Sequence, residues 1–461
     1  MAQSLASLPL LPDVATDTPA LLADGLDNWV TYGELKKLAN QWREQLAGPK
    51  ALVFLYARND IATIAGLIGA LAAGHSVALF DPDLPPETRA DLEGTYHPEK
   101  VIGREPGTLY CPPASTNAQP LHPDLALLLS TSGSTGSPKL VRLTLRSVIT
   151  NAVAIADVLG IMGDDVAAGY LPIHYSYGLS VVTSHLARGA RVRLTEMSLT
   201  DRAFWPAMRD AGITHLPGVP FHFQILLKLG LRRLNLPTLK VLTQAGGSLA
   251  VEARRQAYEY MAEVGGRFYV MYGQTEASPR MTTLQHDNFE LAPQSVGTAL
   301  PGCHIEILDP NATGEGEVIF HGPNVMMGYA ECRADLERGD DLNSRLSTGD
   351  VGRLDAEGNL TLVGRTKRFG KVYGLRVNLD ELEAQAMTVM EAAVTQVGDE
   401  VLIHFVAAEG GEGDQERCEA VLARLTERNT LPRSVYRFRP VDRIPRTERG
   451  KIDYAKLEEA A

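Results

Sequence analysis

The feature that most constrains the fold is an alternation of helix-like and strand-like segments along the chain. Residues 61–73 form a continuously apolar run with the composition of a buried helix, and a short β-type run follows at residues 76–80. Apolar residues recur at helical spacing over residues 145–159, and residues 125–129 and 240–243 are further β-type runs. This alternation is typical of α/β proteins in which helices cover a sheet.

The start of one helix can be placed from two residues. Thr31 precedes Glu34 by three residues, the spacing of a capping box in which each side chain satisfies a free backbone N–H of the first turn. Apolar residues then recur at helical spacing up to Leu46. We therefore expect a helix over residues 31–46.

The pattern of predicted secondary structure changes at about His304. Short β-like pieces separated by turn residues follow, as in HIEILDPNATGEGEVIF and RLDAEGNLTLVGR. A basic, glycine-containing segment comes after Arg365, and a mixed α/β tail completes the chain. We expect a main domain at residues 1–365 and a smaller domain at residues 366–461.

Charge and cysteine content exclude several classes of protein. The formal net charge is −12, which argues against general binding to nucleic acid. The four cysteines lie far apart and show no metal-ligand spacing, as expected in a reducing compartment. The N-terminus does not read as a secretory signal, and the apolar run at residues 61–73 is shorter than the ~20 residues that span a bilayer. We expect a cytoplasmic protein without a membrane span.

A Ser/Thr/Gly-rich segment, STSGSTGSPK at residues 130–139, directly follows an apolar strand-like run. Small and hydroxylated residues allow backbone N–H groups to approach an anion, so the segment fits a phosphate-binding loop. The P-loop of NTPases requires Gly before the Lys and Ser or Thr after it, whereas Pro138 and Leu140 stand there. Taken alone, a Ser/Gly run of this kind is more typical of a flexible surface loop.

Four further motifs follow this loop in order: YGQTEAS at residues 272–278, STGDVGRLDAEGNLTLVGR at 347–365, KRFGKVYGLRVNLDELE at 367–383, and PRTERGKIDYAKL at 445–457. Together they resemble the adenylate-forming superfamily of acyl- and aryl-CoA synthetases, nonribosomal peptide adenylation domains and luciferases. The resemblance covers nearly the whole chain. It implies an α/β fold with a large N-terminal domain of layered sheets and helices plus a β-subdomain, and a small mobile α+β C-terminal domain.

The resemblance also implies residue roles in binding ATP and Mg²⁺. Lys451 would bridge the attacking carboxylate and the α-phosphate, Lys139 would bind phosphate, and Glu276 together with Thr131 would hold Mg²⁺. The remaining ATP contacts are assigned to Ser132, Gly133, Ser134, Thr135, Gly136, Gly246, Tyr272, Gln274, Thr275, Asp350 and Arg365.

A second group of roles concerns movement of the C-terminal domain. Lys367 aligns with the position at which this domain pivots between two half-reactions in the family. The pivot would withdraw Lys451 and bring Lys371 and Gly374 to the tunnel of the incoming thiol.

The acid-binding segment, LPIHYSYGLS at residues 171–180, contains no carboxylate. Amino-acid-activating relatives place an aspartate there for the substrate ammonium, so the resemblance favours an aryl or fatty-acyl carboxylic acid. Many synthetases have His where Tyr175 stands, and His174 lies one position earlier. The expected substrate pocket comprises His174, Tyr175, Tyr177, Val219, Phe221, Gly246, Gly273 and Ser278.

The expected activity is that of an ATP-dependent acid–thiol ligase that forms acyl-AMP and transfers the acyl group to a thiol. The acceptor is either coenzyme A or the phosphopantetheine of a separate acyl carrier protein, because no carrier-attachment motif follows Leu457. The alternatives are a stand-alone amino-acid adenylating enzyme, a non-catalytic nucleotide-binding member of the fold and a hydrolytic NTPase.

Overall fold

The computed structural model describes residues 10–105, 107–112, 119–130, 139–365, 368–372, 375–408, 411, 413–428, 431–446 and 452–459. The chain forms two compact units. The first comprises Met1–His304 with Phe320–Leu346, and the second comprises Ile305–Ile319 with Ser347–Ala461. The boundary after residue 365 is expected from the pivot of a mobile domain. It stays a prediction, because a division into compact units does not locate a pivot.

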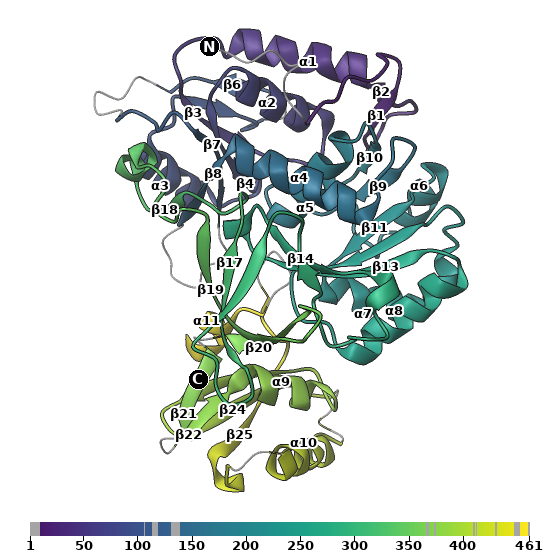
Figure 1. The fold of residues 1–461 in the computed structure, drawn as a ribbon, viewed down its shortest axis with the longest axis vertical. Helices are drawn as coiled ribbons and strands as arrows, with labels where there is room; N and C mark the ends of the chain where they lie inside the picture. The colour runs from purple at the N-terminus through teal and green to yellow at the C-terminus, as the bar shows by residue number, and fades with distance from the viewer. Residues whose placement is uncertain are drawn as a thin grey trace. The chain divides into compact units, whose positions relative to one another are not determined.

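The largest sheet of the first unit has the strand order β15-β14-β13-β12-β11-β9-β10-β1-β2 (Figure 1). Its central strands are parallel, and the outer strands β2, β14 and β15 are antiparallel to their neighbours. The bounds are β1 Pro19–Leu22, β2 Val30–Thr31, β9 Val166–Gly169, β10 Arg191–Leu194, β11 His215–Gly218, β12 Val241–Gln244, β13 Arg267–Gly273, β14 Arg280–Leu284 and β15 Thr298–Ala299.

A second sheet of this unit has the order β18-β8-β7-β4-β3-β5-β6. Strands β7, β4, β3 and β5 are parallel, and all five residues of β3 are buried, as expected for a strand covered on both faces. The bounds are β3 Leu52–Tyr56, β4 Ser76–Phe80, β5 Lys100–Ile102, β6 Leu109–Tyr110, β7 Leu125–Ser130, β8 Leu140–Thr144 and β18 Gly328–Ala330.

The helices of the first unit cover these sheets. Their bounds are α1 Tyr32–Gln45, α2 Ile61–Ala72, α3 Pro86–Tyr96, α4 Leu145–Leu159, α5 Ser176–Leu186, α6 Phe204–Asp210, α7 Pro220–Leu229 and α8 Val251–Glu263, with 3₁₀ turns at Leu231–Leu234, Thr275–Ala277, His286–Asn288 and Arg333–Glu337. The predicted capping box is confirmed, because Thr31 accepts from the Glu34 backbone N–H and Glu34 accepts from that of Thr31.

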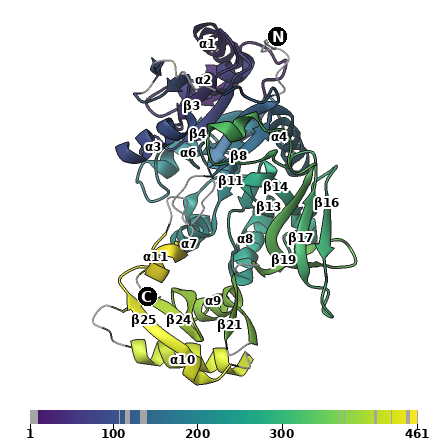
Figure 2. The same ribbon diagram turned by 90° about the vertical axis from the view of Figure 1, so that its left-hand side faces the viewer.

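Helices α1 and α2 pack side by side (Figure 2). Gly69 makes this close approach possible, since a Cβ there would lie 2.6 Å from the Ala39 carbonyl oxygen of α1. Helix α2 is buried along nearly its whole length, as its apolar composition predicts. Within the described part of the chain, no helix has both the length and the apolar character needed to cross a membrane.

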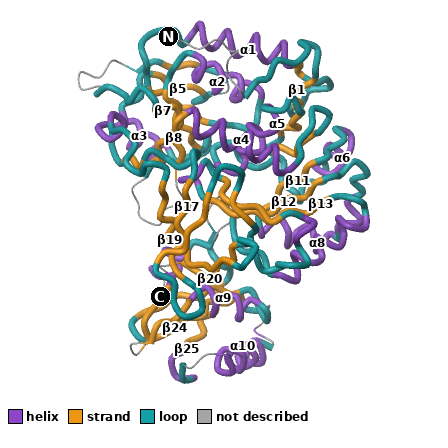
Figure 3. Tube along the Cα trace, in the orientation of Figure 1, coloured by secondary structure: helices purple, strands orange, loops and turns teal. Residues whose placement is uncertain are grey.

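The second unit is built from short strands and three α-helices among its described residues (Figure 3). Its sheets have the orders β16-β17-β19-β20, β21-β22 and β23-β24-β25. The bounds are β16 His304–Leu308, β17 Gly316–His321, β19 Arg345–Leu354, β20 Leu360–Arg365, β21 Phe369–Val372, β22 Leu375–Asn378, α9 Leu379–Met387, β23 Ala392–Val397, β24 Glu400–Val406, α10 Asp414–Arg428, a 3₁₀ turn at Arg433–Val435, β25 Tyr436–Val441 and α11 Tyr454–Glu459.

The predicted fold class is confirmed by this arrangement. Strands β7 and β12, and helix α4, lie within a residue of the segments expected from the sequence. The short β-like pieces expected after residue 304 form β16, β17, β19 and β20. The second unit has its own apolar core, in which Leu382 of α9 packs with Ile403 of β24 and Val421 of α10.

Candidate functional site

The predicted phosphate loop connects two neighbouring antiparallel strands of the first unit. Ser130 ends β7 and pairs with Leu140, the first residue of β8. The loop residues assigned to ATP or Mg²⁺, Thr131, Ser132, Gly133, Ser134, Thr135 and Gly136, lie outside the described residues. The strands therefore define where the loop begins and ends.

Lys139, at the end of this loop, is held by an exposed ion pair. Its Nζ lies 2.9 Å from Glu331 Oε1 and 5.7 Å from the ring centroid of Tyr329. Both partners of the ion pair have about half of their side-chain surface exposed. Because exposed ion pairs contribute only about 0–1 kcal/mol, a triphosphate can displace Glu331 at little cost.

Glu276 is connected to the same place through Tyr329. The Tyr329 hydroxyl donates a hydrogen bond of 2.7 Å to Glu276 Oε1, and partial burial together with the Glu276 carboxylate raises the pKa of Tyr329 well above its usual value. The tyrosine therefore remains a protonated donor. We call Lys139, Glu276, Tyr329 and Glu331 the phosphate-loop cluster. Two residues predicted from separate motifs thus meet through a tyrosine whose role the sequence analysis did not identify.

The donors of this cluster fit magnesium better than a metal that requires several protein ligands. Among the described residues, no group of three or more His, Cys, Asp or Glu side chains is placed to hold a metal ion. Mg²⁺ is commonly bound by one or two carboxylates together with phosphate oxygens and water. Glu276 supplies such a carboxylate, and Tyr329 orients it.

Three of the predicted substrate-pocket residues meet at the carboxyl ends of the parallel strands. Tyr175 precedes α5, Val219 precedes α7, and Gly246 follows β12. Gly246 has φ of +83°, and a Cβ there would lie 2.6 Å from the Tyr175 hydroxyl oxygen and 3.1 Å from a methyl carbon of Val219. Only glycine is accommodated at this position without strain, and this edge of an α/β sheet is where ligands commonly bind.

The remaining residues of the YGQTEAS motif are embedded in the fold around it. Ser278 donates from its hydroxyl to the Asn324 carbonyl oxygen at 2.9 Å, and the Thr275 and Ser176 hydroxyl oxygens lie 3.1 Å apart. Tyr272 is buried, and within the described structure Gln274 Nε2 is buried without a hydrogen-bond partner. A Cβ at Gly273 would overlap the Pro279 carbonyl oxygen, so this glycine allows backbone contact.

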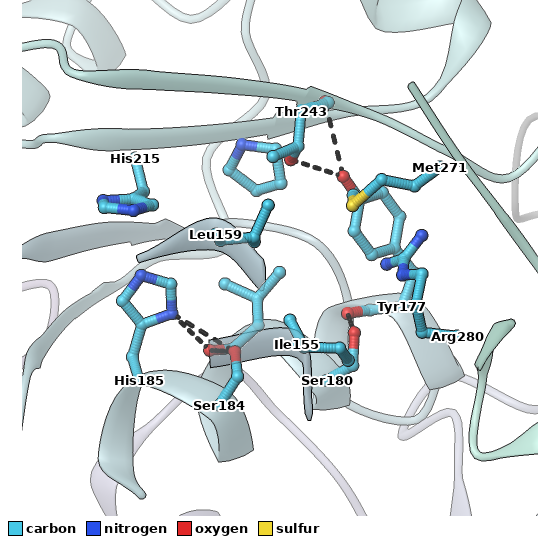
Figure 4. A pocket seen from close by; sticks show the side chains of 12 residues that line it. Ile155, Leu159, Tyr177, Ser180, Ser184, His185, His215, Thr243, Met271 and Arg280 are labelled. Carbon is cyan, nitrogen blue, oxygen red and sulfur yellow. Dashed lines mark hydrogen bonds between the residues drawn. The ribbon is translucent and has the colours of Figure 1, made fainter. Parts of the chain in front are cut away.

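Three predicted pocket residues have different surroundings. His174 is buried, with its Nε2 3.5 Å from Asp81 Oδ2, whereas Phe221 is exposed. Tyr177 is buried and shares a hydrogen bond of 2.8 Å with the Thr243 hydroxyl. It lines a cavity of about 20 Å³ (Figure 4) with residues that the sequence analysis did not identify, among them His185, His215 and Arg280.

The two predicted ribose-binding residues lie together in the second unit. Asp350 of β19 pairs across the antiparallel ladder with Arg365 of β20. Arg365 donates from Nε to Asp350 Oδ1 at 3.0 Å, and the Asp350 side chain is buried whereas that of Arg365 is exposed. Strand pairing thus brings together two residues that are 15 apart in the sequence.

Of the functional residues predicted near the C-terminus, only one lies in the described part of the chain. Lys451, Lys367 and Gly374 lie outside the described residues, and Lys371 lies in β21. An isolated bridge between Arg446 and Ile452 closes the segment that contains Lys451.

Arg368, next to the predicted pivot, is held by acidic and aromatic side chains. Its guanidinium lies 2.8 Å from Asp380, 3.1 Å from Glu383 and 3.9 Å from the ring centroid of Tyr454. The Tyr454 hydroxyl donates to Glu383 at 2.6 Å. This network ties the residue before β21 to α9 and α11 of the second unit.

Comparison with known proteins agrees with this geometry. The family model described as AMP-binding enzyme matches residues 91–330, more than half of the chain. A 2-succinylbenzoate–CoA ligase of Staphylococcus aureus strain MSSA476 is 26% identical over 342 residues, covering 72% of this chain and 67% of that protein.

Solved structures show the same fold. ATP-bound MatB from Rhodopseudomonas palustris has a TM-score of 0.82 and 22% identity, covering 100% of this chain and 98% of that chain. VinN in complex with L-aspartate has a TM-score of 0.63 and 26% identity, covering 76% of this chain and 95% of that chain. The family match confirms the resemblance drawn from the motifs, and the chain belongs to the AMP-binding enzyme family.

Proposed function

We propose that the chain is an ATP-dependent, AMP-forming acid–thiol ligase. It joins a carboxylic acid to the α-phosphate of ATP, releases pyrophosphate, and transfers the acyl group of the acyl-AMP to a thiol. The observation that carries this proposal is the phosphate-loop cluster, which brings Glu276 and Lys139 to one end of the loop between β7 and β8. Membership of the family and the ligase named among the relatives support the same reaction.

The chemistry requires positive charge and aimed donors around the triphosphate. The loop residues 131–136 would supply backbone N–H groups, and Lys139 would leave Glu331 for a phosphate oxygen. Glu276, assisted by Thr131, would hold Mg²⁺, which neutralises charge on the phosphate oxygens when it is bound. Tyr329 keeps the Glu276 carboxylate oriented.

Two groups of residues would contact the nucleoside. Asp350 accepts hydrogen bonds and is already oriented by Arg365, so the pair suits the two ribose hydroxyls. Gly246, Tyr272, Gln274 and Thr275 would surround the base. The buried, unpartnered amide nitrogen of Gln274 is a donor that ligand binding would satisfy.

The C-terminal residues would act in turn. Lys451 would stabilise the charge that develops as the carboxylate attacks, and the pivot at Lys367, between residues 1–365 and 366–461, would then replace it with Lys371 and Gly374 beside the thiol. Coenzyme A is the acceptor that the name of the Staphylococcus aureus relative supports. Phosphopantetheine on a separate acyl carrier protein is the second candidate acceptor. We place the enzyme in the cytoplasm because its four cysteines are free thiols.

Exchange of labelled pyrophosphate into ATP, measured with and without acids, tests the proposal. The ligase reaction predicts exchange that requires an acid, and Lys451→Ala should abolish it while sparing thiolysis of supplied acyl-AMP. Equal loss of both steps would contradict the two-conformation scheme. A nucleotide-binding protein would show no exchange, and an NTPase would release phosphate without an acid. Amino acids belong in the panel because VinN was solved with L-aspartate.

A further inference from the structure

A small cavity lies beneath the predicted acid-binding residues of the first unit. Its volume is about 20 Å³, slightly more than the roughly 10–15 Å³ that one water molecule needs. The lining is Ile155, Leu159, Tyr177, Ser180, Val181, Ser184, His185, His215, Pro217, Thr243, Met271 and Arg280. The space suits one end of a ligand rather than a whole ligand. Most of its accessible surface is apolar, although seven of the twelve lining residues carry polar side chains.

The position of the cavity follows from the strands that line it. Pro217 of β11 lies two residues before the predicted pocket residue Val219, which follows that strand, and Met271 lies two residues before Gly273 on β13. Strands rise about 3.3 Å per residue, and side chains two apart share a face, so the cavity lies roughly 7 Å deeper on the same face. It is therefore placed where the distal end of a bound acid would lie.

Arg280 brings an uncompensated positive charge to this cavity. Its side chain is buried, and its guanidinium carbon lies 5.1 Å from the ring centroid of Tyr177 (Figure 4). In the described part of the chain, no carboxylate pairs with this guanidinium, and its buried Nε has no hydrogen-bond partner. A buried charge without a partner is costly, which indicates that an anion completes the site.

Two histidines line the same cavity. His185 and His215 pack edge to face with ring centroids 4.8 Å apart, and among the described residues neither Nε2 atom has a hydrogen-bond partner. Burial lowers the pKa of His185 to about 4, so its ring is neutral at pH 7. Since Nδ1 lies 2.8 Å from the Val181 carbonyl oxygen, Nδ1 carries the proton and Nε2 accepts. This end therefore suits a water molecule or hydroxyl.

We infer that this cavity is the distal end of the acyl pocket and that Arg280 binds the second carboxylate of a dicarboxylic acid. The inference rests on the proposed function, and it excludes fatty acids as the preferred substrates, because a hydrocarbon end would leave the buried guanidinium without an anionic partner. The first carboxylate reacts with ATP, and the second remains free.

The test compares dicarboxylic acids with their monomethyl esters, which keep the length but lack the second charge. Pyrophosphate exchange is measured with succinate, glutarate, adipate and 2-succinylbenzoate, each against its monomethyl ester. At least one diacid should exceed its ester by roughly 10- to 100-fold in kcat/KM, the range expected for hydrogen bonds to a charged group. Arg280→Met should remove that preference by lowering the diacid value alone, and Arg280→Lys should retain part of it.

Stability supplies a readout that does not depend on activity. Without ligand, Arg280→Met should melt at or above the temperature of the wild type, because no hydrogen bond of the guanidinium is lost among described residues. Arg254 is the matched control, since this buried arginine donates to the Leu249 and Ser295 carbonyl oxygens. Arg254→Met should melt lower, because those acceptors lose their donors.

The outcomes separate this inference from the proposed function. Exchange that is equal for diacids and esters, and unchanged by Arg280→Met, would overturn the dicarboxylate site while supporting the ligase. Absence of exchange with every acid would contradict the ligase. In that case, the melting temperature is measured with 10 mM diacid. A rise in the wild type that is absent in Arg280→Met supports the dicarboxylate site, and the absence of a rise in the wild type overturns it.

Discussion

Tyr329→Phe tests the phosphate-loop cluster by removing one hydroxyl. That hydroxyl donates to the predicted Mg²⁺ carboxylate, Glu276, at 2.7 Å. Loss of a hydrogen-bond partner of a metal ligand typically costs 10- to 100-fold in metal affinity or activity. Glu276 is only half-buried, so water replaces part of the lost interaction, and we expect the lower end of that range. A tenfold effect corresponds to about 1.4 kcal/mol.

The assay is the Mg²⁺ dependence of pyrophosphate exchange at saturating acid. Tyr329→Phe should raise the Mg²⁺ concentration for half-maximal exchange about tenfold and leave the KM for the acid unchanged. Tyr110→Phe is the matched control, because Tyr110 is an exposed tyrosine of β6 that contacts Arg104. An unchanged Mg²⁺ dependence, or an equal change in the control, would refute the role assigned to Tyr329.

Three further perturbations test other parts of the structure. Gly246→Ala should raise the KM for the acid at least tenfold, since the new Cβ would lie 2.6 Å from a tyrosine hydroxyl oxygen in a φ of +83°; an unchanged KM would contradict its place in the pocket. Asp350→Asn should raise the KM for ATP more than that for 2′-deoxy-ATP, and equal effects would exclude a ribose contact. Burial lowers the pKa of His185 to about 4 from about 6.5, so the unfolded chain binds more protons between these values, and stability is lost as the pH falls through this window. One such histidine costs about 2 kcal/mol at pH 5, so His185→Gln should lose less stability than the wild type between pH 7 and pH 5 in thermal melts, and equal losses would contradict this reasoning.

Local sequence rules predicted the elements that are stabilised by nearby residues. The capping box of Thr31 and Glu34 begins α1, and the apolar run at residues 61–73 forms the buried helix α2. Ordered motifs also predicted that Asp350 and Arg365 act together, and strand pairing places them in contact. The capping box and the buried helix could be predicted because each depends on a short segment, whereas ribose binding by Asp350 and Arg365 stays a prediction.

The missed residues depend on contacts between distant segments. Tyr329 meets Glu276 across 53 positions, because the backbone just before β18 contacts the 3₁₀ turn that contains Glu276, with the Met326 N–H donating to the Glu276 carbonyl oxygen at 2.8 Å. Arg280 follows a recognised motif by two residues. Its role could not be predicted from the motif, because the role depends on a buried, uncompensated charge that results from the packing of α5 against the sheet. The surroundings of Arg368 could not be predicted from the sequence, because its partners Asp380, Glu383 and Tyr454 come from two later helices.

Product stoichiometry tests the central claim most directly. Purified protein is incubated with ATP, Mg²⁺, coenzyme A and an acid that supports exchange, and AMP, ADP, pyrophosphate, phosphate and thioester are quantified together. Acid–thiol ligation predicts AMP, pyrophosphate and acyl-CoA in a ratio of 1:1:1, all dependent on the acid. Formation of ADP and phosphate, or release of AMP without a matching amount of thioester, would contradict it.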